Sequence, residues 1–295
     1  MRPLGTVPGA VLFLLAALLA GAAPIHAESE NPRERDVEQV PIEAPPDRPR
    51  VGERISFHGR WMGLPVGGGS IEVKDLVSYN GRDAYLIEAE GHSNDVLSTF
   101  YPIQDLLRSY LDAETLQPLR FEKYQREGHY RSQEIVNFDY ERGVATYHSL
   151  LNNSTKEISL PADTHDIISA FYWLRMQPID PSRTIPINIY SDERVYRTEI
   201  KPVKTVMLDL LRRGTFPCLM IEPVASFKGI FVRRGRMWVY VTTDAARMPL
   251  FVKISTPWGL MTGVIDRESL QRPGSARSTS RGDTLTTEGS AVPES

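Results

Sequence analysis

The stretch GLPVGGGSIEV, residues 63–73, places three consecutive glycines directly before an alternating run of apolar and polar residues. A phosphate-binding P-loop needs Lys and Ser or Thr after its glycines, at the start of a helix, and a dinucleotide site also needs a helix there. Here the glycines lead into residues 70–74, whose period of two is typical of a strand. We therefore predict that the glycines bend a strand or admit a second backbone, and that they bind no phosphate.

Strand-like alternation continues outward from this stretch over most of the chain. Ile55 and Phe57 precede it, and a further strand follows Asn80-Gly81, the strongest short signal for a hairpin turn. Additional strands are predicted at 185–190, 195–201, 218–225, 237–242, 250–255 and 260–266. With about a dozen strands in the core, the fold is predicted to be mainly β.

Two segments are predicted to be helices. The first covers residues 94–101, and the second covers residues 164–176 with Asp163 as its N-cap. Because both are short, each is predicted to lie on the sheet rather than to form a separate layer. One apolar stripe marks the second helix: Ile167, Phe171 and Leu174.

A long polar hairpin is predicted over residues 119–139, turning at Glu127-Gly128. One of its faces combines side chains from both strands: Arg120, Glu122, Tyr124, Arg126, His129, Arg131, Gln133 and Ile135. Both faces are polar, so two interpretations stay open. Either the hairpin projects into solvent, or its charged face lines the inner surface of a curved sheet and meets the headgroup of a ligand.

The two ends of the chain differ from the core in composition. Residues 1–27 contain a positive start, an apolar stretch too short to span a bilayer and a cleavage site, which predicts a secretory signal peptide. If it stayed uncut, the apolar stretch would tether the protein. Residues 28–50 and 272–295 have few large apolar side chains and are predicted to be a disordered arm and a disordered tail. Residues 51–271 then form a single β-rich domain, soluble after cleavage.

The residue types give little sign of catalysis. The formal net charge of −3 does not favour a nucleic acid partner. The histidines show no metal-ligand spacing and there is no G-x-S-x-G motif, so we predict no metal, cofactor or nucleophilic site. Enzyme activity stays open through paired carboxylates, because four glutamates could face one another across strands: Glu88, Glu90, Glu122 and Glu134.

Several motifs, taken in their order along the chain, resemble one known family. They include Gly-Glu-Arg at 52–54, Trp-Met-Gly-Leu-Pro-Val-Gly at 61–67, Ser-Tyr-Leu-Asp at 109–112, Asp-Ile-Ile-Ser-Ala-Phe-Tyr-Trp-Leu-Arg at 166–175, and Trp-x4-Thr-Asp at 238–244. Together they resemble the domain of unknown function 3108 family of secreted Gram-negative proteins. The resemblance implies a large curved antiparallel sheet, a half-barrel or β-spiral similar to that of periplasmic lipoprotein carriers, with one or two short helices in its concavity. It implies a periplasmic location and supplies no catalytic residues.

These observations lead to a hypothesis for the function. We expect a non-catalytic periplasmic protein of the cell envelope that binds an amphiphilic ligand, a lipid or glycolipid, in the curved sheet. The residues predicted to bind it are Arg120, Glu122 and Tyr124 at the headgroup and Phe171, Tyr172 and Trp173 near the cavity. One alternative is an enzyme that acts on envelope glycan with paired carboxylates, and another is a scaffold that binds envelope proteins through an exposed sheet edge.

Overall fold

The computed structural model of the chain describes residues 32–38, 40–211, 213–225, 236–257 and 259–270. All strands of this part of the chain belong to one 16-stranded sheet. The first nine are β1 (Arg33–Asp36), β2 (Arg54–Trp61), β3 (Leu64–Tyr79), β4 (Arg82–Ser93), β5 (Ile103–Asp112), β6 (Pro118–Glu127), β7 (Tyr130–Asp139), β8 (Val144–Ser149) and β9 (Thr155–Ser159). The others are β10 (Thr164–His165), β11 (Ile185–Ser191), β12 (Arg194–Leu210), β13 (Gly214–Ala225), β14 (Arg236–Thr242), β15 (Pro249–Thr256) and β16 (Gly259–Ile265). The helices are α1 (Asp95–Ser98), α2 (Ile167–Arg175) and a 3₁₀ turn η2 (Glu268–Leu270).

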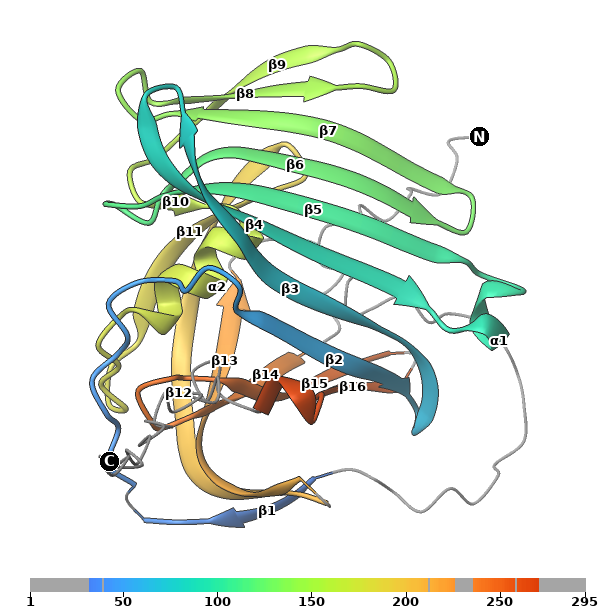
Figure 1. Cartoon of the computed structure of the whole chain (residues 1–295), viewed down its shortest axis with the longest axis vertical. Coiled ribbons are helices and arrows are strands. Elements are labelled where there is room, and N and C mark those ends of the chain that lie inside the picture. Colours follow the sequence, from blue (N-terminus) through green and yellow to red (C-terminus); the bar gives the residue numbers. More distant parts are fainter. Residues whose placement is uncertain (1–31, 39, 212, 226–235, 258, 271–295) are drawn as a thin grey trace, which may run out of the picture.

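Two meanders build the sheet. Strands β2 to β9 follow one another as neighbours, β11 to β16 do the same, and β16 pairs with β2 to join the two. Neighbouring strands within both meanders are antiparallel, so short turns can connect them. β10, in contrast, pairs with β11 in parallel. The sheet runs from β10 to β9 and curves strongly without closing (Figure 1). This confirms the predicted mainly β fold with a large curved antiparallel sheet.

The triple glycine lies where three strands come close together. Gly67 has φ +154°, and a Cβ at this position would lie 2.1 Å from the carbonyl oxygen of His92 on β4. A Cβ at Gly68 would lie 2.7 Å from the carbonyl oxygen of Phe57 on β2. Neither distance leaves room for a side chain. The close approach of a second backbone, which the sequence predicted as one role of these glycines, is therefore confirmed.

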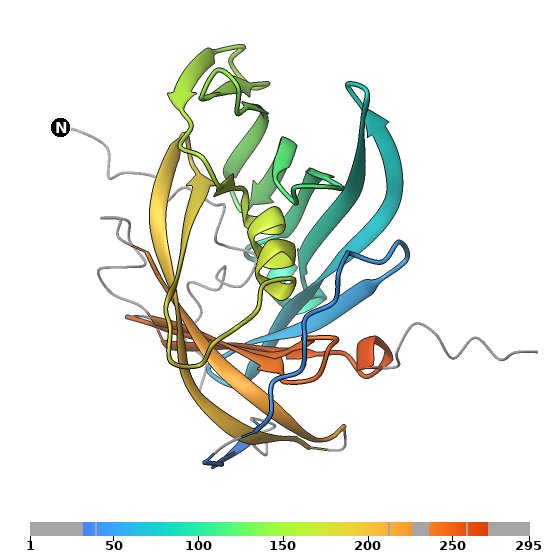
Figure 2. The ribbon, with the colours of Figure 1, turned by 90° about the vertical axis from the view of Figure 1, so that its left-hand side faces the viewer.

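The helix α2 lies inside the curve of the sheet (Figure 2). It starts after Asp166, whose carboxylate accepts hydrogen bonds of 2.8 and 2.9 Å from two backbone N–H groups of the first turn. The predicted start at residue 164 is wrong, because Thr164–His165 pairs with β11 as β10. Asp163, the predicted cap, instead has a positive φ of 56° in the preceding turn. The other helix, α1, forms within the predicted segment but is shorter, and Asn94 caps it.

Part of the N-terminal arm is ordered, in contrast to the disorder predicted for residues 28–50. β1 pairs with the second half of β12, and the hydroxyl of Tyr240 donates to the Glu34 carboxylate at 2.6 Å. Farther along, Arg247 donates to the carbonyl oxygen of Glu43 at 3.0 Å. The arm orders because β12 extends beyond β11 and offers unpaired backbone groups there. The predicted signal peptide and C-terminal tail lie outside the described residues.

Within the described ranges, no helix combines the length and the apolar character that crossing a bilayer requires.

Candidate ligand-binding cavity

A cavity of about 610 Å³ lies between α2 and the inner face of the sheet. From α2 it is lined by Ile167, Phe171 and Leu174, which recur every three or four residues and so share one side of the helix. Both halves of the sheet supply further apolar side chains: Phe57, Ile71, Leu107, Phe121, Ile187 and Val252. Pockets that hold small ligands commonly measure about 300–1,000 Å³ and are mostly apolar. This cavity therefore has the size and the lining of a ligand site.

A group of inward-facing glycines keeps the cavity open. Gly59 on β2 lies opposite Gly263 on β16 and Gly67 on β3, while Gly69 lies opposite Gly91 on β4. All five line the cavity. Because glycine has no side chain, the inner face of the sheet is bare at Gly59, Gly69, Gly91 and Gly263, whereas a Cβ at Gly67 would point at the backbone of β4. The space that aliphatic side chains occupy elsewhere on this face remains available here.

One part of the cavity wall is charged. Glu134 and Asp192 are part of its lining, and the Nζ of Lys123 lies between them, 2.9 Å from Glu134 Oε1 and 3.1 Å from Asp192 Oδ1. Lys123 is only 1% exposed. Burial lowers the pKa of Lys123, but the two carboxylates outweigh this effect and the pKa is raised overall. The cavity thus combines apolar walls with a buried ionic group.

A second acidic group adjoins the same wall. Gln125 Nε2 donates to Asp105 Oδ2 at 3.2 Å and to Glu127 Oε1 at 3.3 Å, and Asp105 lines the cavity. Burial is the largest cause that raises the pKa of Glu127 to about 9, followed by its hydrogen bond with Asp105 and the charge of that residue. Glu127 therefore carries a proton at neutral pH.

Replacing Glu127 by Gln is expected to flatten the pH dependence of stability between about pH 7 and pH 9. The folded protein keeps the Glu127 proton up to about pH 9, whereas the unfolded chain releases it near the ordinary value of 4.5. The folded state therefore binds more protons than the unfolded state in this window, and the stability of the wild type falls as pH rises. Urea unfolding at several pH values should show a smaller fall of the midpoint in Glu127→Gln. Glu90→Gln, at an exposed position of β4, should keep the wild-type slope. Equal slopes in all three proteins would contradict a protonated Glu127.

Buried polar contacts fix both ends of α2. At its start, Asp166 Oδ2 accepts a 2.7 Å hydrogen bond from the Ser109 hydroxyl on β5, and burial raises the pKa of Asp166 to about 6. At its end, Arg175 donates two 2.8 Å hydrogen bonds to the Glu53 carboxylate and one of 2.9 Å to the carbonyl oxygen of Ala246. The helix that forms one wall of the cavity is thus tied to the sheet at both ends.

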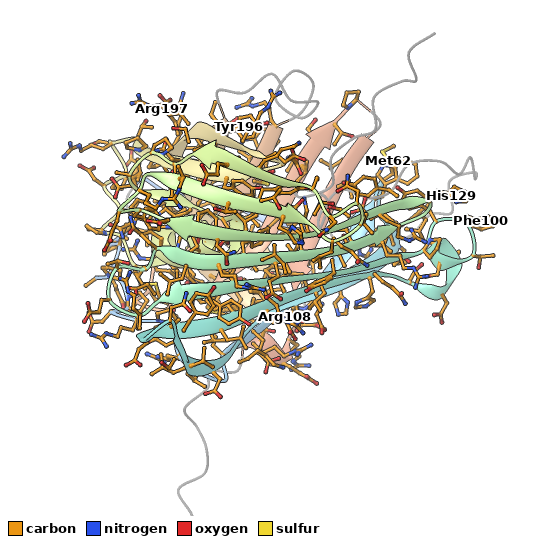
Figure 3. The ribbon with its side chains drawn as sticks, turned by 90° about the horizontal axis from the view of Figure 1, so that it is seen from above. Met62, Phe100, Arg108, His129, Tyr196 and Arg197 are labelled. Atoms are coloured by element: carbon orange, nitrogen blue, oxygen red, sulfur yellow. The ribbon has the colours of Figure 1, made fainter. Side chains whose placement is uncertain are left out.

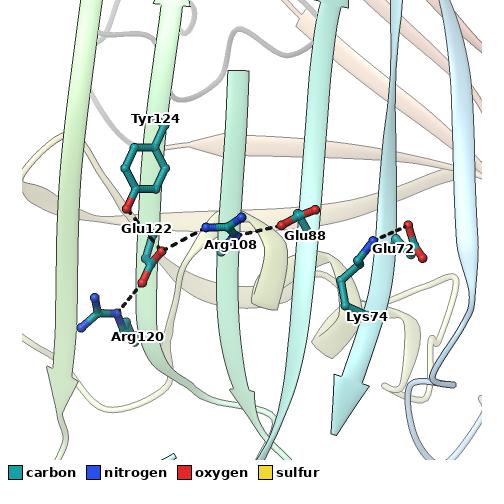
Figure 4. Close-up of polar contacts among 7 residues, drawn as sticks. All are labelled: Glu72, Lys74, Glu88, Arg108, Arg120, Glu122 and Tyr124. Carbon is teal, nitrogen blue, oxygen red and sulfur yellow. Dashed lines mark hydrogen bonds and ion pairs between the residues drawn. The ribbon is translucent and has the colours of Figure 1, made fainter. Parts of the chain in front are cut away.

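The three predicted headgroup residues lie on the outer face of the sheet (Figure 4). Arg120 Nε donates to Glu122 Oε1 at 2.7 Å, and the hydroxyl of Tyr124 donates to Glu122 Oε2 at 3.5 Å. Side chains alternate along β6, and Phe121, the neighbour of both Arg120 and Glu122, lines the cavity from the opposite face. The interpretation of the Arg120 face as an inner lining is therefore wrong. The alternative, a hairpin that projects into solvent, is wrong as well, because β6 pairs with β5 and β7 pairs with β8 inside the sheet. Ligand binding by these three residues stays a prediction.

The glutamates considered for catalysis are also dispersed. Arg108 lies between Glu88 and Glu122, at 2.8 Å and 3.8 Å respectively, so these two carboxylates do not face each other directly (Figure 4). Glu90 is exposed, and Glu134 pairs with Lys123 on the inner face. In the part of the chain that the structure describes, no group of three or more His, Cys, Asp or Glu side chains could hold a metal ion.

Of the three predicted residues on α2, Phe171 lines the cavity. Tyr172 is fully buried in the cluster formed with β3 to β8. Trp173 packs against the His165 ring, with 5.2 Å between the ring centroids. Sequence reasoning missed Asp105 and the inward role of Lys123. The alternation of side chains along β6 could have indicated the inward position of Lys123, because it places Phe121 and Lys123 on the face opposite Arg120.

The open, strongly curved antiparallel sheet, which encloses a helix and an apolar cavity, is a half-barrel architecture. The chain belongs to the family described as "Protein of unknown function (DUF3108)", whose model matches residues 56–266. The resemblance inferred from the sequence motifs is thereby confirmed. Among solved structures, a "Beta-barrel-like Protein of Domain of Unknown Function DUF1849 from Brucella abortus" is similar, with 9% sequence identity and a TM-score of 0.49. The match covers 73% of this chain and 97% of the other. No curated protein matches the sequence.

Proposed function

We propose that this protein binds an amphiphilic molecule, a lipid or glycolipid, in the cavity beside α2, and that it does so in the periplasm without catalysing a reaction. The observation that carries the proposal is the group of inward-facing glycines, including Gly59, Gly69 and Gly91, which holds open a space bounded by aliphatic and aromatic side chains. The acyl part of the ligand occupies this space, because transfer of apolar surface out of water is favourable.

The charged part of the cavity wall supports an amphiphilic rather than a purely apolar ligand. Lys123, Glu134 and Asp192 would cost free energy beside a wholly apolar molecule, whereas a polar headgroup can exchange hydrogen bonds with them. The proposed periplasmic location is supported by the signal-like N-terminal sequence.

A scaffold function through strand addition has less support. The free edge strand β9 is short, and it carries Lys156 and Glu157. Lys156 also forms an ion pair with Glu193, in the turn between β11 and β12. Charged side chains on a short edge strand discourage pairing with another chain.

Filling the cavity is expected to abolish ligand binding. Gly91 is buried, lines the cavity and lies between Gly69 and Asp105 in neighbouring strands. A phenylalanine at this position would occupy the proposed acyl site, so Gly91→Phe should bind a fluorescent fatty acid at least about tenfold more weakly than the wild type, a loss of about 1.4 kcal/mol. Titration of the fluorescence signal measures this affinity.

Two further variants make that result interpretable. Glu90→Phe adds the same ring at the adjacent exposed position and should leave binding unchanged. Gly59→Leu provides a second way to fill the cavity, since a Cβ there meets only ordinary contacts, the nearest being the carbonyl oxygen of Gly67 at 3.5 Å. If folded Gly91→Phe and Gly59→Leu both bind the probe as tightly as the wild type, the cavity is not the ligand site.

A further inference from the structure

The connections of the first meander alternate between the two ends of the sheet. The β2–β3, β4–β5, β6–β7 and β8–β9 connections (62–63, 94–102, 128–129 and 150–154) lie at one end, which also holds α1 and is called the α1 end (Figure 1). The β3–β4, β5–β6 and β7–β8 connections (80–81, 113–117 and 140–143) lie at the other.

Exposed apolar side chains gather at the α1 end. Val96 is 74% exposed, Phe100 73%, Met62 64% and Leu151 54%. Among the described residues, the three connections at the opposite end contain no large apolar side chain of comparable exposure. Exposed apolar side chains that are grouped at one end of a protein mark an interaction site more often than single scattered residues do.

Three of these connections, at 62–63, 94–102 and 128–129, adjoin one another. The side chain of Asn94, at the start of the α1 segment, donates to the carbonyl oxygen of Pro65 at 2.7 Å. The backbone N–H of Gly128 donates to the carbonyl oxygen of Pro102 at 2.9 Å. Figure 3 accordingly shows Met62, Phe100 and His129 at the same end of the molecule.

Two arginines lie beside this apolar surface without a counter-charge. Arg126 and Arg131 are exposed and stand directly opposite each other across β6 and β7. Like charges in this arrangement destabilise a sheet. In the described part of the chain neither forms an ion pair, and Arg131 instead donates to the carbonyl oxygens of Gly128 and Tyr130. This exposed pair of like charges, with no acidic side chain among the described residues paired to it, fits an anionic partner.

We propose that the α1 end docks on the surface of a lipid bilayer that contains anionic lipids. Val96, Phe100 and Met62 enter the boundary between headgroups and acyl chains, about 5–10 Å deep, while Arg126 and Arg131 contact the phosphates. Asp95 is the one acidic residue on the four connections of this end, so the charge of the surface is dominated by the arginines beside it. A bilayer is favoured over a protein partner because the patch combines exposed apolar side chains with cations.

The cavity lies next to the same surface. Gly59, Val66, His92 and Ile103, near the ends of β2 to β5 that adjoin these connections, are part of its lining. Docking would therefore bring the cavity close to the membrane from which an amphiphile is taken or to which it is delivered. This inference goes beyond the proposed function, since vesicle binding is measured separately from occupation of the cavity.

The test is co-sedimentation of the purified protein with vesicles of phosphatidylcholine, with and without phosphatidylglycerol. We expect binding to the phosphatidylglycerol vesicles, and we expect the double variant Val96→Ser/Phe100→Ser to weaken it at least about tenfold. Both side chains are exposed, so the variant should unfold at the wild-type temperature. Leu76→Ser, which removes a 47% exposed side chain near the opposite end of β3, should bind like the wild type.

A second variant isolates the electrostatic contribution to vesicle binding. Arg126→Gln/Arg131→Gln should lose most of the preference for phosphatidylglycerol and most of the salt dependence of binding. Absence of wild-type binding to these vesicles would overturn the proposal and leave the patch to a protein partner. Equal weakening by Leu76→Ser would also overturn it, because the contact would then not be specific to the α1 end.

Discussion

Replacing Glu53 by Gln is expected to lower the free energy of unfolding by about 3–5 kcal/mol, because it leaves the Arg175 guanidinium buried without its counter-charge. The two residues are 9% and 5% exposed and share two hydrogen bonds of 2.8 Å. Arg175 is the last residue of α2, so the loss also loosens the helix that forms one wall of the cavity. Urea unfolding followed by far-ultraviolet circular dichroism measures the change.

The matched control breaks an exposed ion pair in the neighbouring part of the sheet. Glu72→Gln removes the partner of Arg54, whose side chain is 51% exposed, and should cost about 1 kcal/mol or less. The double variant Glu53→Leu/Arg175→Met removes both buried charges and should recover much of the stability lost in Glu53→Gln. Similar small losses for Glu53→Gln and Glu72→Gln would show that the buried pair does not anchor α2.

Replacing Gly67 by Ala is expected to cost about 2–4 kcal/mol, because the added Cβ forces β3 and β4 apart. That Cβ would lie 2.1 Å from the carbonyl oxygen of His92 and 2.9 Å from the Cα of Ser93, and neither backbone atom can rotate away. The φ of +154° adds strain for any residue with a side chain. Thermal and urea unfolding of the purified variant measure the loss.

Gly59→Ala is the control for this substitution. Gly59 faces Gly67 across the same strand pair, but a Cβ there meets the carbonyl oxygen of Gly67 at an ordinary 3.5 Å. Its effect on the free energy of unfolding should stay within about 1 kcal/mol. If Gly67→Ala is as stable as Gly59→Ala, the tight approach of β4 to the triple glycine is not a feature of the protein in solution.

Local signals explain what the sequence predicted well. The run that follows the glycines has a period of two, which predicts that they bend a strand or admit a second backbone within a sheet. Gly67 and Gly68 have the second of these roles. Alternation also predicted which side chains of β6 and β7 share a face. The turn lies at residues 128–129 rather than at 127–128, so Arg126 faces Arg131 rather than His129. The pairing register therefore differs from the predicted one by two residues. Because side chains alternate with a period of two, this shift leaves every side chain on its predicted face.

What the sequence could not decide is which face of this hairpin is inside. A strand normally reveals its inner face by its apolar side chains, but β6 has polar residues on both sides. Its inner face carries the buried Lys123. Two carboxylates compensate the charge of this lysine: Glu134 lies on the neighbouring strand, and Asp192 lies 69 residues away in the sequence. Pairings over such separations arise from the fold and leave no local pattern.

The start of α2 was mispredicted for a similar reason. Thr164 and His165 continue the helical pattern in sequence, but their backbone pairs with β11, so the helix begins at the next available cap, Asp166. The ordered part of the N-terminal arm likewise depends on the length of β12, which composition alone does not indicate.

The most direct test of the proposed binding function is native mass spectrometry of the protein purified without detergent from a Gram-negative periplasm, followed by organic extraction. We predict a discrete added mass, which extraction identifies as a lipid or glycolipid, on the wild type and on Glu90→Phe, and its loss in Gly91→Phe. Wild-type protein that carries no added mass, or an added mass that Gly91→Phe retains, would contradict the proposal that the cavity beside α2 is the binding site.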